Sequence, residues 1–364
     1  MGGARVTRLG AAALPLLAIL SFGAGVATTI AFAGETLGYD FQAYLAAADR
    51  LVDGQPLYDH TVDIAGSFAI FLYPPPFAVG FIPLALLPAG VGLWLWIAAC
   101  VGMTVAAIMI LPVRAPVRWA ILLLAGLDWP VVYAIKLGQV GPLLLLLFAV
   151  GWRLIGSQSR LGGIGAAGAL IKVQPALLFA WALLTGRWRT ITTGLALGAG
   201  AVVLTLPLVG VTAWTDYFAL LGRVSAPVTT PHNFTAGAVA FQAGMAEGPS
   251  GALQIAAVLV TLSIWVFAVR GRSAEVGYLA TIVASQLFSP LLWDHYAVLL
   301  LLPVAWLLQA RQWWAVAIPL VTSIPLLAIT PPVAYPIVFF VCLIAPLLVR
   351  ASGPITSQGA EASP

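Results

Sequence analysis

Residues 11–33 read AAALPLLAILSFGAGVATTIAFA, an uncharged run long enough to cross a bilayer as one helix. Similar runs recur along nearly the whole chain of 364 residues, of which 62% are hydrophobic and 8% are charged. A soluble domain carries about 25% charged residues. Runs of this length favour helices over the short alternating strands of a membrane barrel. The sequence therefore predicts an all-α integral membrane protein.

Apolar runs and polar intervals give the expected layout. We expect about twelve transmembrane helices, at 11–33, 74–88, 90–112, 117–135, 139–155, 162–184, 189–211, 251–270, 275–292, 295–309, 312–329 and 332–349. The polar intervals 34–73 and 212–250 are the expected large loops. Residues 1–350 then form a single membrane domain, and 351–364 a disordered cytoplasmic tail.

The distribution of basic residues predicts the orientation, because cytoplasmic loops carry the excess of Lys and Arg. With both termini inside, the large loops face outward, and the cytoplasmic side receives Arg5, Arg8, Arg187, Arg189, Arg270, Arg272, Arg311 and Arg350. The same layout puts four basic residues outside, against the rule: Arg114, Arg118, Arg153 and Arg160. Either some middle segments are re-entrant, or an anionic lipid holds these arginines there.

Several classes of function find no support in the sequence. Its basic residues are scattered, so no nucleic-acid surface is expected. No Gly-rich loop follows a strand, so a nucleotide-binding fold is not expected. Cys100 and Cys342 both lie in apolar runs, which favours two buried free cysteines over a disulfide. No cofactor is expected; no cluster has metal-ligand spacing, although an ion held by carboxylates from separate loops stays open.

The first loop contains DFQAYLAAADRLVDG at 40–54, whose apolar residues recur at helical spacing. We expect a short amphipathic helix on the membrane surface, with Asp40 near its N-terminus. Asp40 is then either a helix cap or a base facing a lipid-borne substrate. Asp49 and Asp53 are expected on the solvated side of this helix.

Five pieces of sequence, in order over about residues 38–303, carry a family resemblance: YDFQAYLAAADRLVDGQPLYD, YPPPFAVGFIPLALLP, LGQVGPLLLLLFAVGW, GALIKVQPALLF and SPLLWDHYAVLLLLP. The chain resembles glycosyltransferase family 87, the polyprenyl-phosphate-mannose-dependent α-1,2-mannosyltransferases of the GT-C membrane superfamily. The resemblance implies a GT-C bundle with a juxtamembrane helical outer loop, and a catalytic aspartate at Asp40. It also implies inverting transfer of a hexose, mannose by family precedent, to a lipid or glycan acceptor. The expected place is the outer face of the bacterial cytoplasmic membrane.

Such a transfer needs a base for the acceptor hydroxyl and groups that stabilise the departing lipid phosphate. The expected substrate-binding residues are His295, His232, Lys172, Tyr44, Tyr73, Gln139 and Trp293. Three alternatives stay open. His295, together with Trp293 and Tyr296, fits an interfacial aromatic belt. Lys172 fits a buried ion pair with Asp128, and the layout puts Gln139 nearer the cytoplasmic side.

The second loop offers the aromatic and amide side chains that a sugar ring needs, but PHNFTAG at 231–237 replaces the family's Asn-Gln-Ser-type motif, which leaves donor and acceptor open. Two rival functions remain: a transferase of the same superfamily that uses another polyprenyl-phosphate sugar, and a lipid or sugar transporter or flippase.

Overall fold

The computed structural model describes residues 2–58, 70–155, 162–223 and 228–349, with side chains described from residue 13 onward. These residues form helices and no strand, and the only β-type pairing among them is one isolated bridge between Asp128 and Ser323. The expected all-α fold is confirmed. The expected cytoplasmic tail lies outside the described residues.

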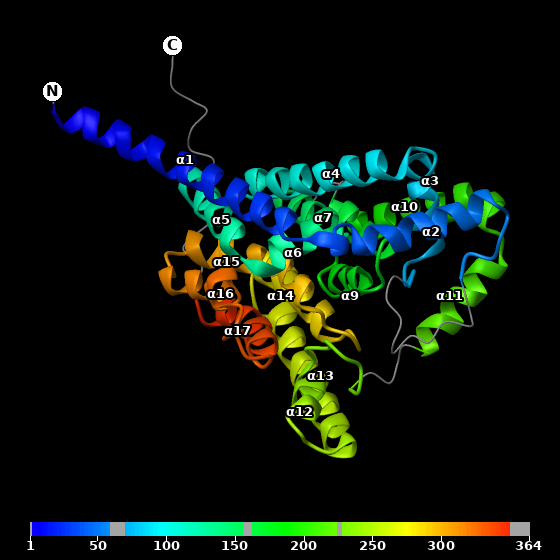
Figure 1. Cartoon of the computed structure of the whole chain (residues 1–364). Helices are drawn as coiled ribbons and strands as arrows, with labels where there is room; N and C mark the ends of the chain where they lie inside the picture. Colours follow the sequence, from blue (N-terminus) through cyan, green and yellow to red (C-terminus); the bar gives the residue numbers. More distant parts are fainter. Residues whose placement is uncertain (1, 59–69, 156–161, 224–227, 350–364) are drawn as a thin grey trace, which may run out of the picture.

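The first half of the chain runs from a long N-terminal helix through a series of shorter ones (Figure 1). Its helices are α1 (Gly2–Ala31), η1 (Gly34–Thr36), α2 (Tyr39–Val52), α3 (Pro75–Ala85), α4 (Ala89–Ile110), α5 (Ala115–Leu127), α6 (Trp129–Leu137), α7 (Gly141–Leu154), α8 (Gly163–Ala167), η3 (Gly168–Leu170), η4 (Gln174–Ala176) and α9 (Leu177–Leu184).

The second half contains two further long helices and a C-terminal group of short ones. Its helices are α10 (Trp188–Val209), α11 (Thr212–Arg223), α12 (Ala236–Gln242), α13 (Glu247–Gly271), α14 (Ala274–Leu287), η5 (Asp294–Leu300), α15 (Leu301–Gln309), η6 (Trp313–Val316), α16 (Ala317–Val321), η7 (Ile324–Leu326) and α17 (Ala334–Leu348).

Four helices among the described residues are long and apolar enough to cross a membrane. They lie within α1, α4, α10 and α13. A fifth candidate is the pair α6 and α7, which bends by 118° at its break. The expected count of about twelve is not confirmed. Several expected spans are broken by Pro or Gly or by short 3₁₀ turns, as in 162–184 and 312–329.

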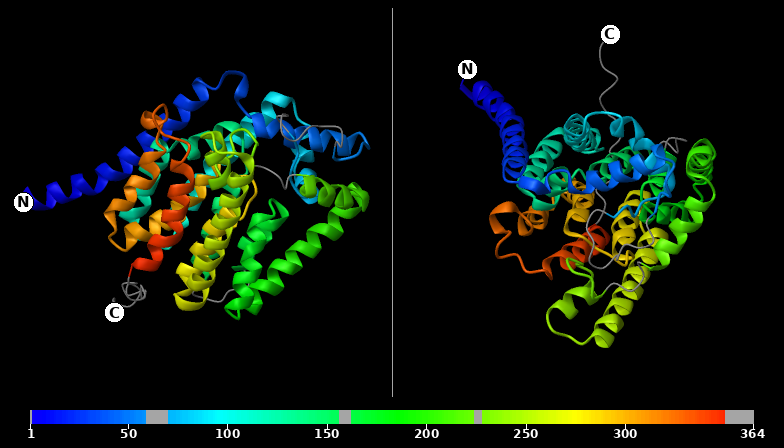
Figure 2. Two further views of the ribbon diagram at one scale, coloured as in Figure 1. Left: turned by 90° about the horizontal axis from the view of Figure 1, so that it is seen from below. Right: turned by 45° about the vertical axis from the view of Figure 1, so that its right-hand side comes forward.

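Close approach of two glycines joins α1 to α5. A side chain on Gly25 would collide with the backbone of Gly126, and one on Gly126 would collide with Ser21. The Ser21 hydroxyl donates a 2.9 Å hydrogen bond to the Leu123 carbonyl oxygen. Small residues of this kind allow membrane helices to pack backbone to backbone. The N-terminal part of α1 extends away from the rest of the bundle (Figure 2).

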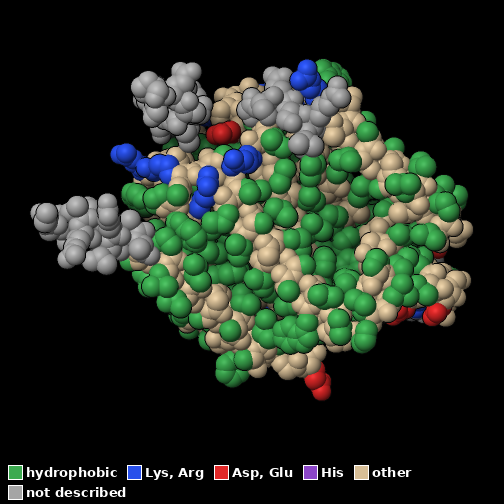
Figure 3. Space-filling view, turned by 90° about the horizontal axis from the view of Figure 1, so that it is seen from above, with side chains coloured by type: hydrophobic (Ala, Val, Ile, Leu, Met, Phe, Trp, Pro, Cys, Tyr) green, Lys and Arg blue, Asp and Glu red, His purple; other side chains and the backbone are tan. Residues whose placement is uncertain are grey.

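Basic residues gather at one end of the bundle, which we call the arginine end. Arg153 donates to the Ile110 carbonyl oxygen at 3.1 Å, Arg187 to that of Ile155 at 2.9 Å, and Arg114 to the Gln309 side chain at 3.2 Å. Figure 3 shows Lys and Arg side chains mainly at the upper left, acidic ones mainly at the lower right, and hydrophobic ones over most of the remaining surface. Arg114 and Arg153 therefore share a side with Arg187, which corrects the layout expected for the middle of the chain.

The reason is that α3 is too short to cross a bilayer by itself. Its 11 residues reach about half the thickness of a bilayer. The Trp96 indole nitrogen, near the start of α4, donates a 2.6 Å hydrogen bond to the Gly138 carbonyl oxygen, and the Gly38 amide donates to that of Lys136 at 2.8 Å. The beginnings of α2 and α4 thus lie together with the end of α6, at the opposite end of the bundle from the arginines.

The broken segment 162–184 explains the rest of the arrangement. It begins and ends near the arginine end, where Arg187 contacts Ile155, while Lys172 at its middle contacts Tyr73 beside α3. The chain therefore enters the bundle and returns on the same side. Of the two explanations for the exceptional arginines, this course of the chain favours the re-entrant one for Arg114 and Arg153, while Arg160 lies outside the described residues.

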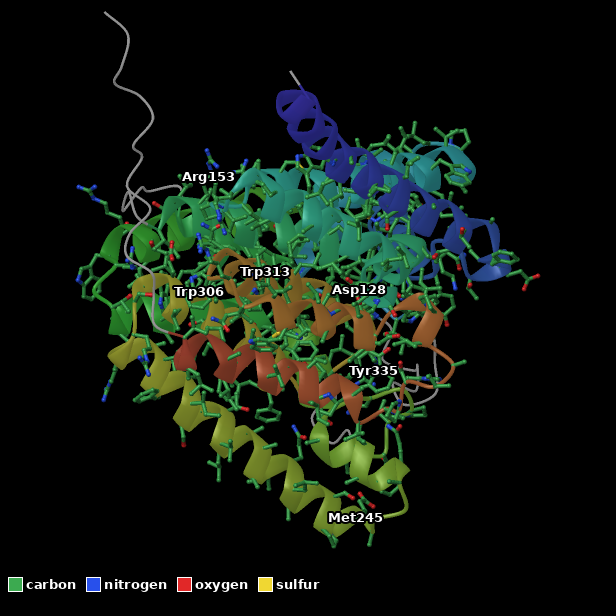
Figure 4. The ribbon with its side chains drawn as sticks, turned by 90° about the vertical axis from the view of Figure 1, so that its left-hand side faces the viewer. Asp128, Arg153, Met245, Trp306, Trp313 and Tyr335 are labelled. Atoms are coloured by element: carbon green, nitrogen blue, oxygen red, sulfur yellow. The ribbon has the colours of Figure 1, made fainter. Side chains whose placement is uncertain are left out.

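Asp128, at the break between α5 and α6, does not pair with Lys172. It is buried, and its carboxylate accepts a 2.9 Å hydrogen bond from the Thr322 hydroxyl. Figure 4 shows Asp128 next to the C-terminal helices, where it lines a small apolar cavity together with Leu301, Ile318 and Val338. The alternative of an ion pair between these two buried charges is wrong, because each has a different partner.

Candidate active site

Helix α2 brings Asp40 to the end of the bundle opposite the arginines. The helix begins after Gly38, whose φ of 71° suits glycine, and its buried side presents Phe41, Tyr44 and Ala48. This matches the predicted amphipathic helix. Asp40 lies in its first turn, and the N-cap position belongs to Gly38, two residues earlier. Asp40 is therefore not the N-cap residue of α2.

Asp40 is half-buried, and its carboxyl lies within the electrostatic reach of Lys172 and His295. Burial raises the pKa of Asp40, while His295, Lys172 and a hydrogen bond from Gln139 act to lower it. The negative charge of Asp294 adds to the increase. The surroundings thus hold a carboxylate that is more basic than an exposed one.

Lys172 is buried, at a non-helical position between η3 and η4. Its ammonium nitrogen lies 3.8 Å from the centroid of the Tyr296 ring and 5.7 Å from that of Tyr73. Both rings stabilise the charge by a cation–π interaction. The break in the helix lets the side chain reach the Asp40 end from a segment that enters from the other side.

A chain of hydrogen bonds connects three of the predicted residues. The Gln139 amide nitrogen lies 3.3 Å from the Tyr73 hydroxyl oxygen, which lies 3.0 Å from the Tyr44 hydroxyl oxygen. The Gln139 side-chain oxygen accepts a 2.6 Å hydrogen bond from the Gly141 amide. All three side chains are buried. Gln139 is therefore beside Asp40, and the expected layout, which put the two at opposite ends of the bundle, is wrong.

His295 occupies the first turn of the 3₁₀ helix η5 and is 5% exposed. Its Nδ1 atom lies 3.5 Å from an Asp294 carboxylate oxygen, and its Nε2 atom has no hydrogen-bond partner among the described residues. The Trp293 ring lies 5.6 Å from the imidazole, between centroids. A buried nitrogen without a partner is costly, which is consistent with a ligand completing this site.

Asn233 fixes the turn that carries His295. Its side-chain oxygen accepts hydrogen bonds from the Leu292 and Thr235 amides, at 3.0 and 3.1 Å, and its side-chain nitrogen donates to the Pro290 carbonyl oxygen at 3.1 Å. The Phe234 amide donates to the Leu292 carbonyl oxygen at 2.7 Å. Hydrogen bonds thus hold the second loop against residues 290–292, directly before the Trp293–His295 turn.

The comparison with known families bears on what this cluster does. A family model described as glycosyltransferase family 87 matches residues 71–293, more than half of the chain. The chain belongs to glycosyltransferase family 87. It is therefore an enzyme that transfers a sugar. The match includes all of the predicted substrate-binding residues except Tyr44 and His295, which flank it together with Asp40.

Two curated relatives are similar over most of the chain. Both are named polyprenol-phosphate-mannose-dependent alpha-(1-2)-phosphatidylinositol pentamannoside mannosyltransferase. The one from Mycolicibacterium smegmatis is 30% identical over 323 residues, 84% of this chain and 77% of the relative. The one from Mycobacterium tuberculosis is 29% identical over 324 residues, 84% of this chain and 73% of the relative. No solved structure matches the chain.

For this family 87 chain, the structure brings together Asp40, Tyr44, Tyr73, Gln139, Lys172, Trp293 and His295. It does not bring His232 into the group. The His232 side chain is exposed, and its backbone has a positive φ of 56°. The neighbouring Asn233 is the buried residue of that motif.

Sequence reasoning missed two residues of the cluster and underrated a third. Asp294 contacts His295, and Trp129 donates a 3.1 Å hydrogen bond from its indole nitrogen to Asp294. Tyr296, assigned only to an interfacial belt, faces Lys172. The Asp-His pair in WDHY was a signal for Asp294, whereas nothing local marked Trp129. No group of three metal-ligating side chains occurs in the described ranges, and a reaction without a cofactor stays a prediction.

Proposed function

We propose that the chain moves mannose from a polyprenyl-phosphate donor to a glycolipid acceptor, with inversion at the anomeric carbon. The observation that carries the proposal is the half-buried Asp40 carboxylate, on whose charge Lys172 and His295 act from the same end of the bundle. One carboxylate base and a cationic site for phosphate are what a single displacement on a sugar phosphate needs. The names of both relatives support the donor.

In this reaction Asp40 takes the proton from the acceptor hydroxyl. The acceptor oxygen forms a bond to the anomeric carbon while the bond from that carbon to the phosphate oxygen breaks. The electron pair of that bond leaves with the lipid phosphate, whose added charge Lys172 and the unpartnered His295 nitrogen stabilise. A single base without a separate nucleophile predicts inversion of a β-linked donor to an α-linked product.

The proposed location is the outer face of a bacterial cytoplasmic membrane. Arg114, Arg153 and Arg187 are at one end of the bundle, and Asp40 is at the other. Because basic residues favour the cytoplasmic side, the arginine end is placed inside and Asp40 outside. A lipid-linked donor on that face would present its phosphate at the level of Lys172.

The proposed acceptor is a phosphatidylinositol mannoside. Both relatives carry that class of acceptor in their names, and the chain covers about three quarters of each. Family membership favours an enzyme over the rival transporter. A donor with another sugar, such as glucose or arabinofuranose, is the second candidate within the superfamily.

Transfer of radiolabelled mannose by the purified protein tests the proposal. We expect label to pass from polyprenyl-phosphate mannose to phosphatidylinositol mannosides, and the product to be sensitive to α-mannosidase. The change Asp40→Asn should reduce the rate by about 10²–10⁴-fold. Asp49→Asn, on the exposed side of the same helix, is the matched control and should leave the rate unchanged.

Parallel reactions with polyprenyl-phosphate glucose and arabinofuranose test the donor. Faster transfer from either one would overturn mannose as the donor. A rate that survives Asp40→Asn would overturn Asp40 as the base, and uptake of sugar or lipid in the absence of any transfer would favour the transporter.

A further inference from the structure

Helix α6 carries a stripe of three large side chains beside Asp40: Trp129, Tyr133 and Lys136. Their spacing of four and three residues places them on one side of the helix. All three are partly exposed, whereas most of the residues between them are buried. We call these three residues the α6 stripe.

Contacts within the stripe fix its shape. The Trp129 and Tyr133 rings are stacked, with centroids 4.6 Å apart and planes 16° apart. The Lys136 ammonium nitrogen lies 5.2 Å from the centroid of the Tyr133 ring. The Trp129 indole is further held by its hydrogen bond to Asp294. The result is a rigid aromatic surface with Lys136 at one side and Asp294 at the other.

The position of the stripe relative to the reacting groups is specific. The Lys136 carbonyl oxygen accepts the Gly38 amide hydrogen bond just before Asp40, and the Tyr133 ring lies 6.2 Å from the His295 ring. Lys172 and His295 are buried, while the stripe is on the more exposed side of the same cluster. In an inverting displacement the acceptor and the leaving group lie on opposite sides of the anomeric carbon. With the phosphate on the buried nitrogens, the acceptor belongs on the exposed side.

The chemistry of the stripe suits a sugar ring. An aromatic face offers an apolar surface to the C–H groups of a hexose, and the flanking groups meet its hydroxyls. Among the described residues each Asp294 oxygen accepts one hydrogen bond, and Oδ1 also lies 3.5 Å from His295 Nδ1, so the carboxylate keeps acceptor capacity. Lys136 forms no ion pair with any described carboxylate, so its ammonium keeps donors for a ligand.

We infer that the α6 stripe, together with Asp294, is the subsite for the terminal sugar ring of the acceptor. The inference rests on the proposed function and names where that substrate binds. It assigns Trp129 and Tyr133 to the ring, and Lys136 and Asp294 to its hydroxyl groups. The subsite recognises the sugar whether it is carried by a lipid or by a short alkyl chain.

Steady-state kinetics with two acceptors test the subsite: octyl α-mannopyranoside and a phosphatidylinositol mannoside. The variants Tyr133→Leu and Lys136→Met should each raise KM for both acceptors about tenfold and leave KM for polyprenyl-phosphate mannose unchanged. The matched control is Trp313→Leu, an exposed aromatic residue near the arginine end, which should change neither constant. Gel-filtration profile and Tm in detergent verify that each variant is folded.

The measured KM values distinguish an acceptor sugar subsite from three other roles of the stripe. Unchanged acceptor KM in both stripe variants would overturn the inference and make the stripe an interfacial aromatic belt. A raised donor KM with unchanged acceptor KM would assign the stripe to the donor and also overturn it. An effect confined to the phosphatidylinositol mannoside would show recognition of the lipid part and contradict a sugar subsite.

A binding measurement keeps the inference distinct from the proposed function. Equilibrium dialysis of radiolabelled octyl α-mannopyranoside against the wild-type protein and Tyr133→Leu requires no turnover. If the wild type binds the mannoside about tenfold more tightly than the variant but transfers no mannose, the donor proposal fails and the subsite stands. If mannose is transferred but both proteins bind the mannoside equally, the subsite fails and the proposed function stands.

Discussion

The ammonium nitrogen of Lys172 lies 3.8 Å from the centroid of the Tyr296 ring, at the end of the bundle that also holds Asp40. This contact places a buried cation where the leaving phosphate is proposed to gather charge. It also helps to explain how a lysine with no ion pair within 4 Å among the described residues is tolerated in a buried position, since a cation–π contact is strongest away from water.

Loss of this cation should slow transfer much more than it weakens binding. Lys172→Met is expected to reduce kcat by about 10²–10³-fold, because it removes a group aimed at charge that develops in the transition state. Tyr296→Phe keeps an aromatic ring under the ammonium and is the control, with a much smaller effect on kcat. Initial rates with saturating donor and acceptor give both values, and an unchanged kcat in Lys172→Met would contradict the role.

The pH dependence of transfer should report Asp40. Burial raises its pKa above the usual range of an aspartate, and a base must be deprotonated to work. Activity should therefore fall as the pH decreases through this raised pKa. Lys172 acts to lower the pKa of Asp40, so removing its charge raises that pKa further. The acid limb of kcat/KM should move to higher pH in Lys172→Met, and movement to lower pH would contradict the assignment.

The glycine contact between α1 and α5 predicts a matched pair of substitutions. Gly25→Val should destabilise the protein by about 1–3 kcal/mol, because the new side chain meets the Gly126 backbone. Gly23→Val is two residues away on the same helix, where an added Cβ meets nothing within 4 Å, and should have little effect. Tm in detergent distinguishes the two, and equal values would contradict the packing of α1.

The hydrogen bond between Thr322 and Asp128 should matter for stability and not for catalysis. Thr322→Val leaves a buried carboxyl without its hydroxyl partner, at an expected cost of about 1–3 kcal/mol. Thr330→Val, which loses hydroxyl bonds at an exposed site in the same region, should have a smaller effect on Tm. The kcat of folded Thr322→Val should equal that of the wild type; a large decrease would link Asp128 to the reaction.

Sequence patterns predicted those helices whose formation depends mainly on residues close together in the chain. The helical spacing of apolar residues located α2, and the uncharged runs located α1, α4, α10 and α13. The depth of Gln139 and the partner of Lys172 could not be found in this way, because both depend on α3 stopping halfway and on segment 162–184 turning back. The hydrogen bond from Trp129 to Asp294 joins residues 165 positions apart, and only tertiary packing brings them together.

The re-entrant segment around Lys172 has a consequence for how the enzyme meets its donor. Its cation is held inside the bundle, and in the proposed orientation it lies level with the headgroups of the outer leaflet, so a lipid phosphate would reach it by lateral diffusion without leaving the bilayer. The enzyme then takes its donor from the plane of the membrane and not from the surrounding buffer. In vesicles, the rate should follow the mole fraction of donor in the lipid, and diluting the vesicles with buffer should leave the rate per enzyme unchanged.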